Sequence, residues 1–198
     1  MLLIPCNETA DVASIMASLA FHCEQDSALT VRKDLNACSA FPALQIFPGA
    51  VRSPLRNRLF VVGSQREPRE LIDLAKSADI VCPVISALAA NPQKITEDPL
   101  NYGGAFDEAG YATINLLRSL GLPKVVGLIQ HLDRIEPKHQ QKIERFYSRF
   151  IVSEFGDEKC LNWSEGQLGT VLRVFDSSSL GQNLSWKSQK GYLLADQV

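Results

Sequence analysis

The 198-residue chain lacks glycine and lysine where a phosphate-binding turn would need them, at its first strand-to-helix junction. Residues 2–4 predict a buried strand, and apolar residues from position 12 onward repeat at the spacing of an amphipathic helix. A nucleoside triphosphatase needs glycines, a lysine and a Ser or Thr in this turn, to hold the phosphates and magnesium. Here the two glycine positions are Pro5 and Ala10, the lysine position is Asp11, and the hydroxyl position is Val12. An Asp ~4 Å from a phosphate repels it by roughly 4 kcal/mol at an effective dielectric of ~20, so we expect this turn not to bind a triphosphate.

An excess of positive charge is also missing. The chain has 20 Lys and Arg against 22 Asp and Glu, and its formal net charge is −2. A surface made for general binding to nucleic-acid phosphates is strongly basic, so we expect no DNA partner and only a local contact with RNA.

Close cysteine pairs and long apolar runs are absent as well. The five cysteines, Cys6, Cys23, Cys38, Cys82 and Cys160, are scattered, which excludes a zinc-type spacing and a secreted disulfide framework. They indicate reduced thiols. No apolar run is long enough to cross a bilayer and no signal peptide is visible, so we expect no membrane partner and a location in the cytosol, the nucleus or both.

What the chain does contain is a regular alternation of strand and helix patterns. Strands are predicted at residues 43–47, 58–62, 79–86, 124–130 and 159–163, and helices at 68–78, 111–120, 137–150 and 168–175. Residues 23–58 are otherwise polar, and residues 87–108 are expected to form a long loop. Pro83 removes one ladder donor and predicts an irregularity or a nearby sheet edge. The alternation predicts an α/β fold, with a doubly wound, mainly parallel sheet covered by helices on both faces.

Four short strings point to a known family. They are residues 71–79 (LIDLAKSAD), 121–127 (GLPKVVG), 130–133 (QHLD) and 191–196 (GYLLAD), and together they span most of residues 58–198. In this order they resemble the Bms1/Tsr1 family of ribosome-assembly proteins, which are built around a translational-GTPase-like G domain. The Bms1 branch keeps a glycine-lysine phosphate loop and the Tsr1 branch does not, so the turn at residues 5–12 places the chain in the Tsr1 branch.

The resemblance implies a domain division. Residues 1–182 would form a degenerate, P-loop GTPase-like G domain. Residues 183–198 would be a C-terminal strand that leads into a β-rich domain of which the chain holds only the start.

The resemblance also identifies the remaining nucleotide-site positions. Gly63 stands where an Asp would help to hold magnesium. Gln130, His131, Leu132 and Asp133 replace the guanine-reading Asn-Lys-x-Asp, so only the last carboxylate is kept. A single carboxylate cannot supply affinity without phosphate and metal contacts, so we expect no catalytic residue, no metal and no cofactor. GTP remains the alternative cofactor.

Two of these residues have simpler explanations. Asp133 is a remnant of base recognition, a helix N-cap or a loop carboxylate, and we favour the cap. His131 could act as a general base, but no nucleophile stands at a suitable spacing, so we favour an exposed polar residue in a loop.

Two groups of cations are candidate RNA contacts. Lys138, Lys142, Arg145 and Arg149 recur along one predicted helix, and Arg52, Arg56 and Arg58 lie in a polar segment. Such groups bind RNA phosphates or simply form a solvated face, and both readings stay open here.

The resemblance implies a ribosome assembly factor for maturation of the small (40S) subunit and processing of its pre-rRNA. It would act as a non-catalytic, GTPase-like scaffold, a pseudoGTPase. Its partners would be the precursor small subunit, its rRNA and other assembly factors, in the nucleolus of the nucleus and also in the cytoplasm. The alternatives are a guanine-nucleotide-binding GTPase of the Bms1 type and a truncated fragment with no function of its own.

Overall fold

The computed structural model describes residues 1–26, 29–34, 42–48, 58–90, 105–122, 124–156 and 159–177. The strands are β1 (Leu2–Pro5), β2 (Leu29–Asp34), β3 (Ala43–Pro48), β4 (Leu59–Gly63), β5 (Val81–Ser86), β6 (Val126–Gln130) and β7 (Lys159–Asn162). The α-helices are α1 (Val12–Gln25), α2 (Pro68–Ser77), α3 (Glu108–Ser119), α4 (Pro137–Phe155) and α5 (Leu168–Ser177). Short 3-10 turns are η1 (Ala87–Ala89), η3 (Leu132–Arg134) and η4 (Glu165–Gln167).

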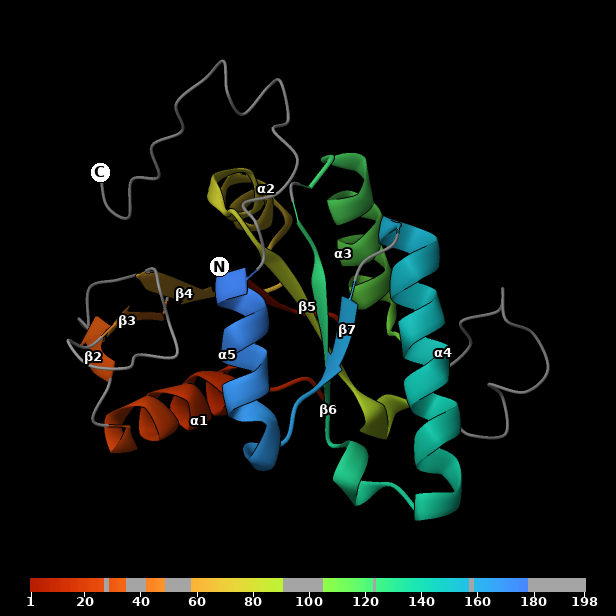
Figure 1. Ribbon diagram of the computed structural model, residues 1–198. Helices are drawn as coiled ribbons and strands as arrows, with labels where there is room; N and C mark the ends of the chain where they lie inside the picture. The colour runs from red at the N-terminus through yellow and green to blue at the C-terminus, as the bar shows by residue number, and fades with distance from the viewer. Residues whose placement is uncertain are drawn as a thin grey trace.

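The strands form one sheet in the order β2-β3-β4-β1-β5-β6-β7. Strands β4, β1, β5, β6 and β7 pair in parallel, and β3 runs antiparallel to both of its neighbours. Figure 1 shows the central strands lying between two groups of helices. The predicted mainly parallel sheet of an α/β fold is therefore confirmed.

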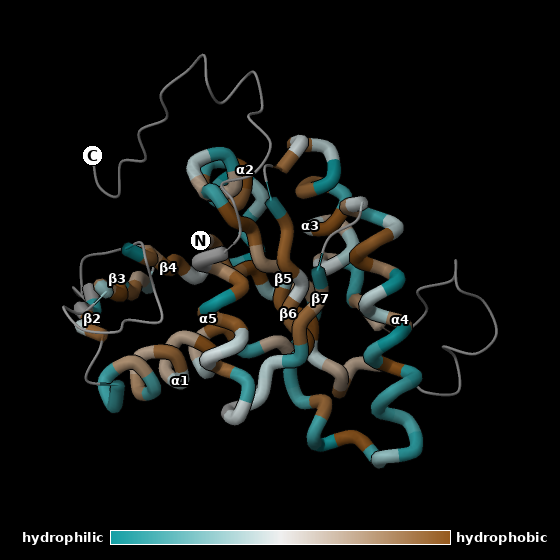
Figure 2. The backbone as a smooth tube through the Cα atoms, viewed as in Figure 1, coloured by the Kyte–Doolittle hydropathy of each residue, from teal (hydrophilic) through white to brown (hydrophobic). Residues whose placement is uncertain are grey.

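Alternate side chains of the strands enter two separate cores. Leu3 packs with residues of α1 and α5, whereas its neighbours Leu2 and Ile4 pack with residues of α2, α3 and α4. This period of two buries both faces of the sheet, as expected for strands that are covered by crossover helices. Hydrophobic residues accordingly run along β5 and β6 in the middle of the molecule (Figure 2). The doubly wound arrangement is confirmed.

Strand β2 was not predicted. Residues 29–34 combine a short apolar start, of which Leu29 is buried, with three charged residues at the other end. The strand forms because all six residues pair with β3, from Leu29 opposite Pro48 to Asp34 opposite Ala43. The expectation of a single strand in residues 23–58 was wrong, because the partner that stabilises this strand is not visible in its own pattern.

Pro83 lies in a central strand, so the predicted nearby edge was wrong, whereas the predicted irregularity was correct. Strand β5 pairs with β1 on one side and β6 on the other. The β5–β6 pairing has a bridge at Val81 opposite Val125 and resumes at Val84 opposite Leu128, with Pro83 between them. A proline inside a central sheet is tolerated where the ladder is interrupted.

Several predicted features differ in extent or lie outside the described residues. Helix α4 continues to Phe155, five residues beyond its predicted end. The predicted C-terminal strand, with the whole of residues 183–198, lies outside the described ranges. Among the helices of the described ranges, none combines the length and apolar character needed to cross a membrane.

Candidate functional site

The candidate site lies at the carboxyl ends of β1, β5 and β6, where ligands of doubly wound sheets bind. Residues 6–11 connect β1 to α1 at this edge. The ends of β5 and β6 supply Ser86 and Gln130, which stand opposite each other in the parallel register. Both side chains are buried, at 0% and 2% exposure.

Asn7 ties the turn to the end of β5. Its side-chain amide donates to the carbonyl oxygens of Ser86, at 3.0 Å, and Ala105, at 3.3 Å. Its Oδ1 accepts from the backbone N–H of Ser86 at 3.1 Å. Asn7 is 1% exposed, so these hydrogen bonds satisfy a buried polar group and hold the turn against β5.

Gln130 holds the same turn from β6. Its Nε2 donates to the carbonyl oxygen of Asp11 at 2.9 Å, and its Oε1 accepts from the backbone N–H of Asp11, also at 2.9 Å. Gln130, at the first guanine-reading position, therefore bonds to the backbone of the turn through both the oxygen and the nitrogen of its side-chain amide.

Three backbone donors of the turn have partners within the protein. Besides Asp11, the N–H of Ala10 donates to the Asn7 carbonyl at 3.1 Å, and the N–H of Cys6 donates to the Val84 carbonyl at 2.8 Å. The N–H of Ser14 donates to Oδ1 of Asp11 at 2.9 Å, so Asp11 is the N-cap of α1. A carboxylate at a helix N-terminus is stabilised by the helix dipole, and here it puts a negative charge at the kind of position that otherwise attracts a phosphate. The residues present do not fit a triphosphate.

Gly63 is explained by packing. A Cβ atom at this position would lie 2.9 Å from Cγ1 of Val12 and 3.0 Å from Sδ of Met16. Glycine allows α1 to lie directly on the end of β4. No carboxylate for magnesium is available at this position, and no group of three or more metal-ligating side chains occurs within the described ranges.

His131 differs from its prediction. It is half-buried rather than exposed, its backbone φ of 59° is left-handed, and its Nδ1 lies 2.9 Å from the Ser86 hydroxyl oxygen. Burial lowers the pKa of the imidazole, nearby Arg134 lowers it further, and Asp133 and Asp11 oppose the shift. In the neutral ring, Nδ1 can accept a hydrogen bond from the Ser86 hydroxyl. His131 therefore links the ends of β5 and β6. Its predicted place in a loop is confirmed, whereas its predicted exposure was wrong.

Asp133 is exposed inside η3 and caps no helix. The N-cap residue of η3 is His131, and that of α4 is Glu136. The predicted capping role was wrong, because the chain forms a separate 3-10 turn before α4 begins. The carboxylate remains accessible at the edge where β6 ends.

Helix α3 approaches the turn closely, which the sequence did not reveal. A Cβ atom at Gly110 would lie 1.9 Å from the carbonyl oxygen of Cys6. Asp107, the N-cap residue of α3, forms an ion pair with Arg66 from the segment between β4 and α2. Asn7, Ser86, Arg66 and Gly110 were all missed, because each acts through a contact distant in the sequence.

The predicted cations are separated in space. Lys138, Lys142, Arg145 and Arg149 all lie on α4. The guanidinium of Arg58 lies 5.0 Å from the centroid of the Phe47 ring, so this residue has a packing partner within the sheet. Arg52 and Arg56 lie outside the described residues.

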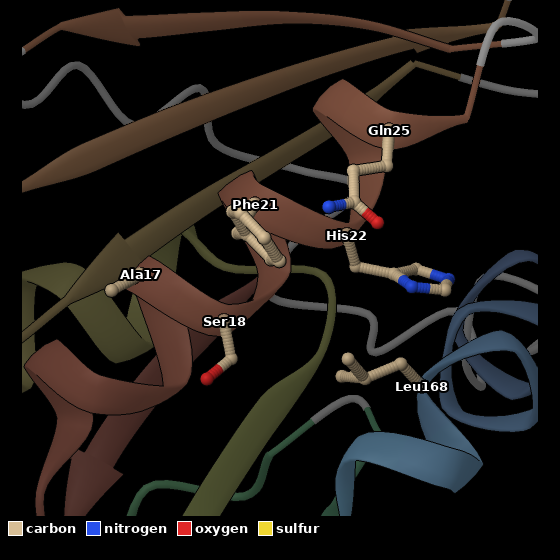
Figure 3. A pocket seen from close by; sticks show the side chains of 6 residues that line it. All are labelled: Ala17, Ser18, Phe21, His22, Gln25 and Leu168. Atoms are coloured by element: carbon tan, nitrogen blue, oxygen red, sulfur yellow. The ribbon is translucent and has the colours of Figure 1, made fainter.

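A pocket of about 410 Å³ lies between α1 and α5. Figure 3 shows its lining residues, Ala17, Ser18, Phe21, His22, Gln25 and Leu168. Five of these belong to α1 and none to the turn at residues 6–11, so this pocket is separate from the candidate site.

Two curated proteins match the sequence, although no family model does. The "Ribosome biogenesis protein BMS1 homolog" of Homo sapiens is 25% identical over 161 residues, covering 76% of this chain and 11% of that protein. The "Pre-rRNA-processing protein TSR1 homolog" of Xenopus laevis is 25% identical over 139 residues, covering 70% of this chain and 15% of that protein. The chain is similar to the Bms1/Tsr1 ribosome-biogenesis family. It spans only a small part of the length of these relatives.

Solved structures support the fold. The translation elongation factor SelB of Methanococcus maripaludis, in complex with the GTP analogue GppNHp, superposes with a TM-score of 0.50 at 11% identity, covering 92% of this chain and 35% of SelB. A bacterial selenocysteine-specific elongation factor, EF-Sec, gives a TM-score of 0.52 at 11% identity, covering 89% of this chain and 28% of EF-Sec. At these identities the likeness concerns the fold alone, and the fold is an α/β GTPase-like domain.

Proposed function

We propose that the chain acts in ribosome biogenesis, as a non-catalytic, GTPase-like scaffold in maturation of the small (40S) subunit and processing of its pre-rRNA. Its partners would be the precursor small subunit, its rRNA and other assembly factors, in the nucleolus and also in the cytoplasm. The names of the two relatives support a role in ribosome biogenesis. The degenerate turn supports assignment to the Tsr1 branch.

The observation that supports a non-catalytic role is the bonding of the turn at residues 6–11. Gln130 binds both backbone groups of Asp11, and the Asp11 carboxylate caps α1. A phosphate would have to displace a carboxylate and break hydrogen bonds that the protein already makes. We therefore propose that the domain contributes its shape and its outer surface, and that it does not turn over a nucleotide.

Co-sedimentation tests the assembly role. The tagged full chain is expressed in cells, and lysates are separated on a density gradient. We expect the chain to migrate with particles that contain precursor small-subunit rRNA, and to lose this migration after RNase treatment. Migration only with free protein would refute the assembly role.

The second candidate is a guanine-nucleotide-binding GTPase of the Bms1 type. It is favoured by Asp133, which is exposed at the edge of the sheet where β6 ends. Titration with a fluorescent guanine nucleotide, with and without magnesium, distinguishes the two functions. If the second candidate holds, Asp133→Ala weakens binding, and Asp73→Ala, at another exposed position on α2, does not. If the scaffold proposal holds, no specific binding is seen in any of the three proteins.

A further inference from the structure

The four cations of α4 lie in one row on the outer face of the helix. Lys138, Lys142, Arg145 and Arg149 are spaced by four, three and four residues, which returns to the same side of a helix with 3.6 residues per turn. The row is about 16 Å long at a rise of ~1.5 Å per residue. Lys138, Arg145 and Arg149 are exposed, and Lys142 between them is half-buried.

The row is opposite the buried face of α4. The buried residues of this helix are Ile143, Tyr147, Phe150 and Ile151. On a helical wheel with ~100° per residue, they fall on the half turned away from the row. The orientation of the cations is therefore set by the packing of α4 against the sheet. Hydrophilic residues recur along α4 in Figure 2.

The acidic residues of α4 lie away from the row. Glu154 accepts a hydrogen bond from Arg118 of α3 at 3.1 Å. Glu144 is near enough to Cys160 of β7 to help raise the pKa of that thiol to about 12, mainly a result of burial. Glu136, just before the helix, pairs with Lys138 at 2.6 Å. Both side chains of this pair are exposed, so solvent screens the attraction and the pair exchanges readily.

We infer that this row, which we name the α4 cation row, binds the phosphate backbone of RNA. The inference rests on the proposed function, because a precursor ribosomal particle is where the chain would meet RNA. A nucleic-acid double helix presents on each strand one phosphate per ~3.4 Å of helix axis, so a row of this length can face several phosphates at once. Protein interfaces are organised around buried aromatic or apolar anchors, and the α4 cation row has no aromatic member. In a chain with a net charge of −2, the row is a local positive surface.

A salt titration of RNA binding tests the inference, with a variant in which three cations of the row are replaced by neutral glutamines. The test variant of the full chain carries Lys138→Gln, Arg145→Gln and Arg149→Gln. The matched control carries Arg69→Gln, Lys159→Gln and Arg173→Gln, which remove the same charge from exposed positions on α2, β7 and α5. Circular dichroism establishes that both variants are folded. Binding to a fluorescein-labelled RNA hairpin is measured by anisotropy between ~50 and ~200 mM salt.

We expect the test variant to lose about tenfold or more in affinity at low salt. Its slope of log affinity against log salt should become less steep by roughly 2 to 3, because three phosphate contacts are lost. The control should bind like the parent chain. Equal binding by the two variants, or no measurable RNA binding by the parent chain, would overturn the inference. So would competition by polyglutamate as efficient as competition by unlabelled RNA, since the row would then bind acidic protein equally well.

The same variants in the gradient experiment separate this inference from the proposed function. In one outcome, the parent chain and the test variant co-sediment equally well with precursor particles, and the two variants bind the hairpin with equal affinity. RNA binding by the α4 cation row is then refuted, and the assembly role stands. If the parent chain does not co-sediment, the assembly role is refuted whatever the hairpin titration shows.

Discussion

At Gly110, the hydrogen side chain allows the start of α3 to touch the turn after β1. A Cβ atom would lie 1.9 Å from the carbonyl oxygen of Cys6 and 2.7 Å from Oδ1 of Asp107. Because the first of these atoms belongs to the backbone, it cannot move aside at low cost. We expect Gly110→Ala to lower the free energy of unfolding by about 1 to 3 kcal/mol, measured by urea denaturation. Gly169→Ala in α5, where a Cβ would meet nothing within 4 Å, should be neutral or slightly stabilising, and an equal loss in both variants would contradict this reading.

The second residue-scale prediction concerns Gln130. Its side chain is 2% exposed and bonds to both backbone groups of Asp11. In Gln130→Ala these groups lose their partners, so we expect a loss of about 2 kcal/mol in the free energy of unfolding. Gln167→Ala, at an exposed position in η4, is the control and should change stability by less than about 0.5 kcal/mol. A Gln130→Ala protein as stable as the control would show that the two hydrogen bonds contribute nothing net.

At the scale of elements, His131 connects the ends of two neighbouring strands. Burial lowers the pKa of this imidazole in the folded state, so the unfolded chain takes up a proton first as the pH falls. The contribution to stability is fully present above the unfolded-state pKa of about 6.5 and is lost as the pH falls through the lower folded-state value. We therefore expect thermal stability to decline below about pH 6.5.

The variant His131→Asn tests this directly, since Asn tolerates the left-handed φ of 59°. The decline in melting temperature between neutral pH and mildly acidic pH should become smaller in this variant. His22→Gln, on α1, should keep the decline of the parent chain. A decline that is unchanged in His131→Asn would rule out the histidine as its source.

The differences between predicted and observed elements have a common cause. The predicted strands and helices that were confirmed carry their own apolar period, as in α4 with Ile143 and Tyr147 on one side. Strand β2 shows such a period only over Leu29, Thr30 and Val31, because its last three residues are all charged. It forms because β3 offers a full set of backbone partners, which local sequence does not encode.

At the scale of the whole molecule, the turn at residues 6–11 should leave the chain indifferent to guanine nucleotides. A ligand that binds only the folded state stabilises it by RT ln(1 + [L]/Kd), which is ~4 kcal/mol at a thousandfold excess over Kd. For a domain of this size, that corresponds to a rise of about 8 to 16 °C in melting temperature. We expect magnesium-GTP at ~1 mM to raise the melting temperature by less than about 2 °C. A shift of the larger size would mean micromolar binding and would favour the GTPase alternative.

The α/β class and the mainly parallel sheet could be predicted from the sequence alone, and so could the departure of residues 5–12 from a glycine-lysine phosphate loop. These follow from apolar periods and from residue types at known spacings, which are local properties. The prediction that Pro5, Ala10 and Asp11 do not bind phosphate rests on such local properties.

The hydrogen-bond partners of the turn at residues 6–11 became visible only in the folded chain. Gln130 and Asp11 are 119 residues apart in sequence, as the hydrogen bonds between them show, and Asn7 reaches Ser86 across 79 residues. Side-chain amides can bind many backbone groups, so their type does not reveal their partner. The same holds for the α4 cation row, because spacing placed its members on one side of a helix but only the packing of α4 against the sheet turned that side outward. Pairings between distant segments depend on how the sheet closes, and that is a property of the folded chain.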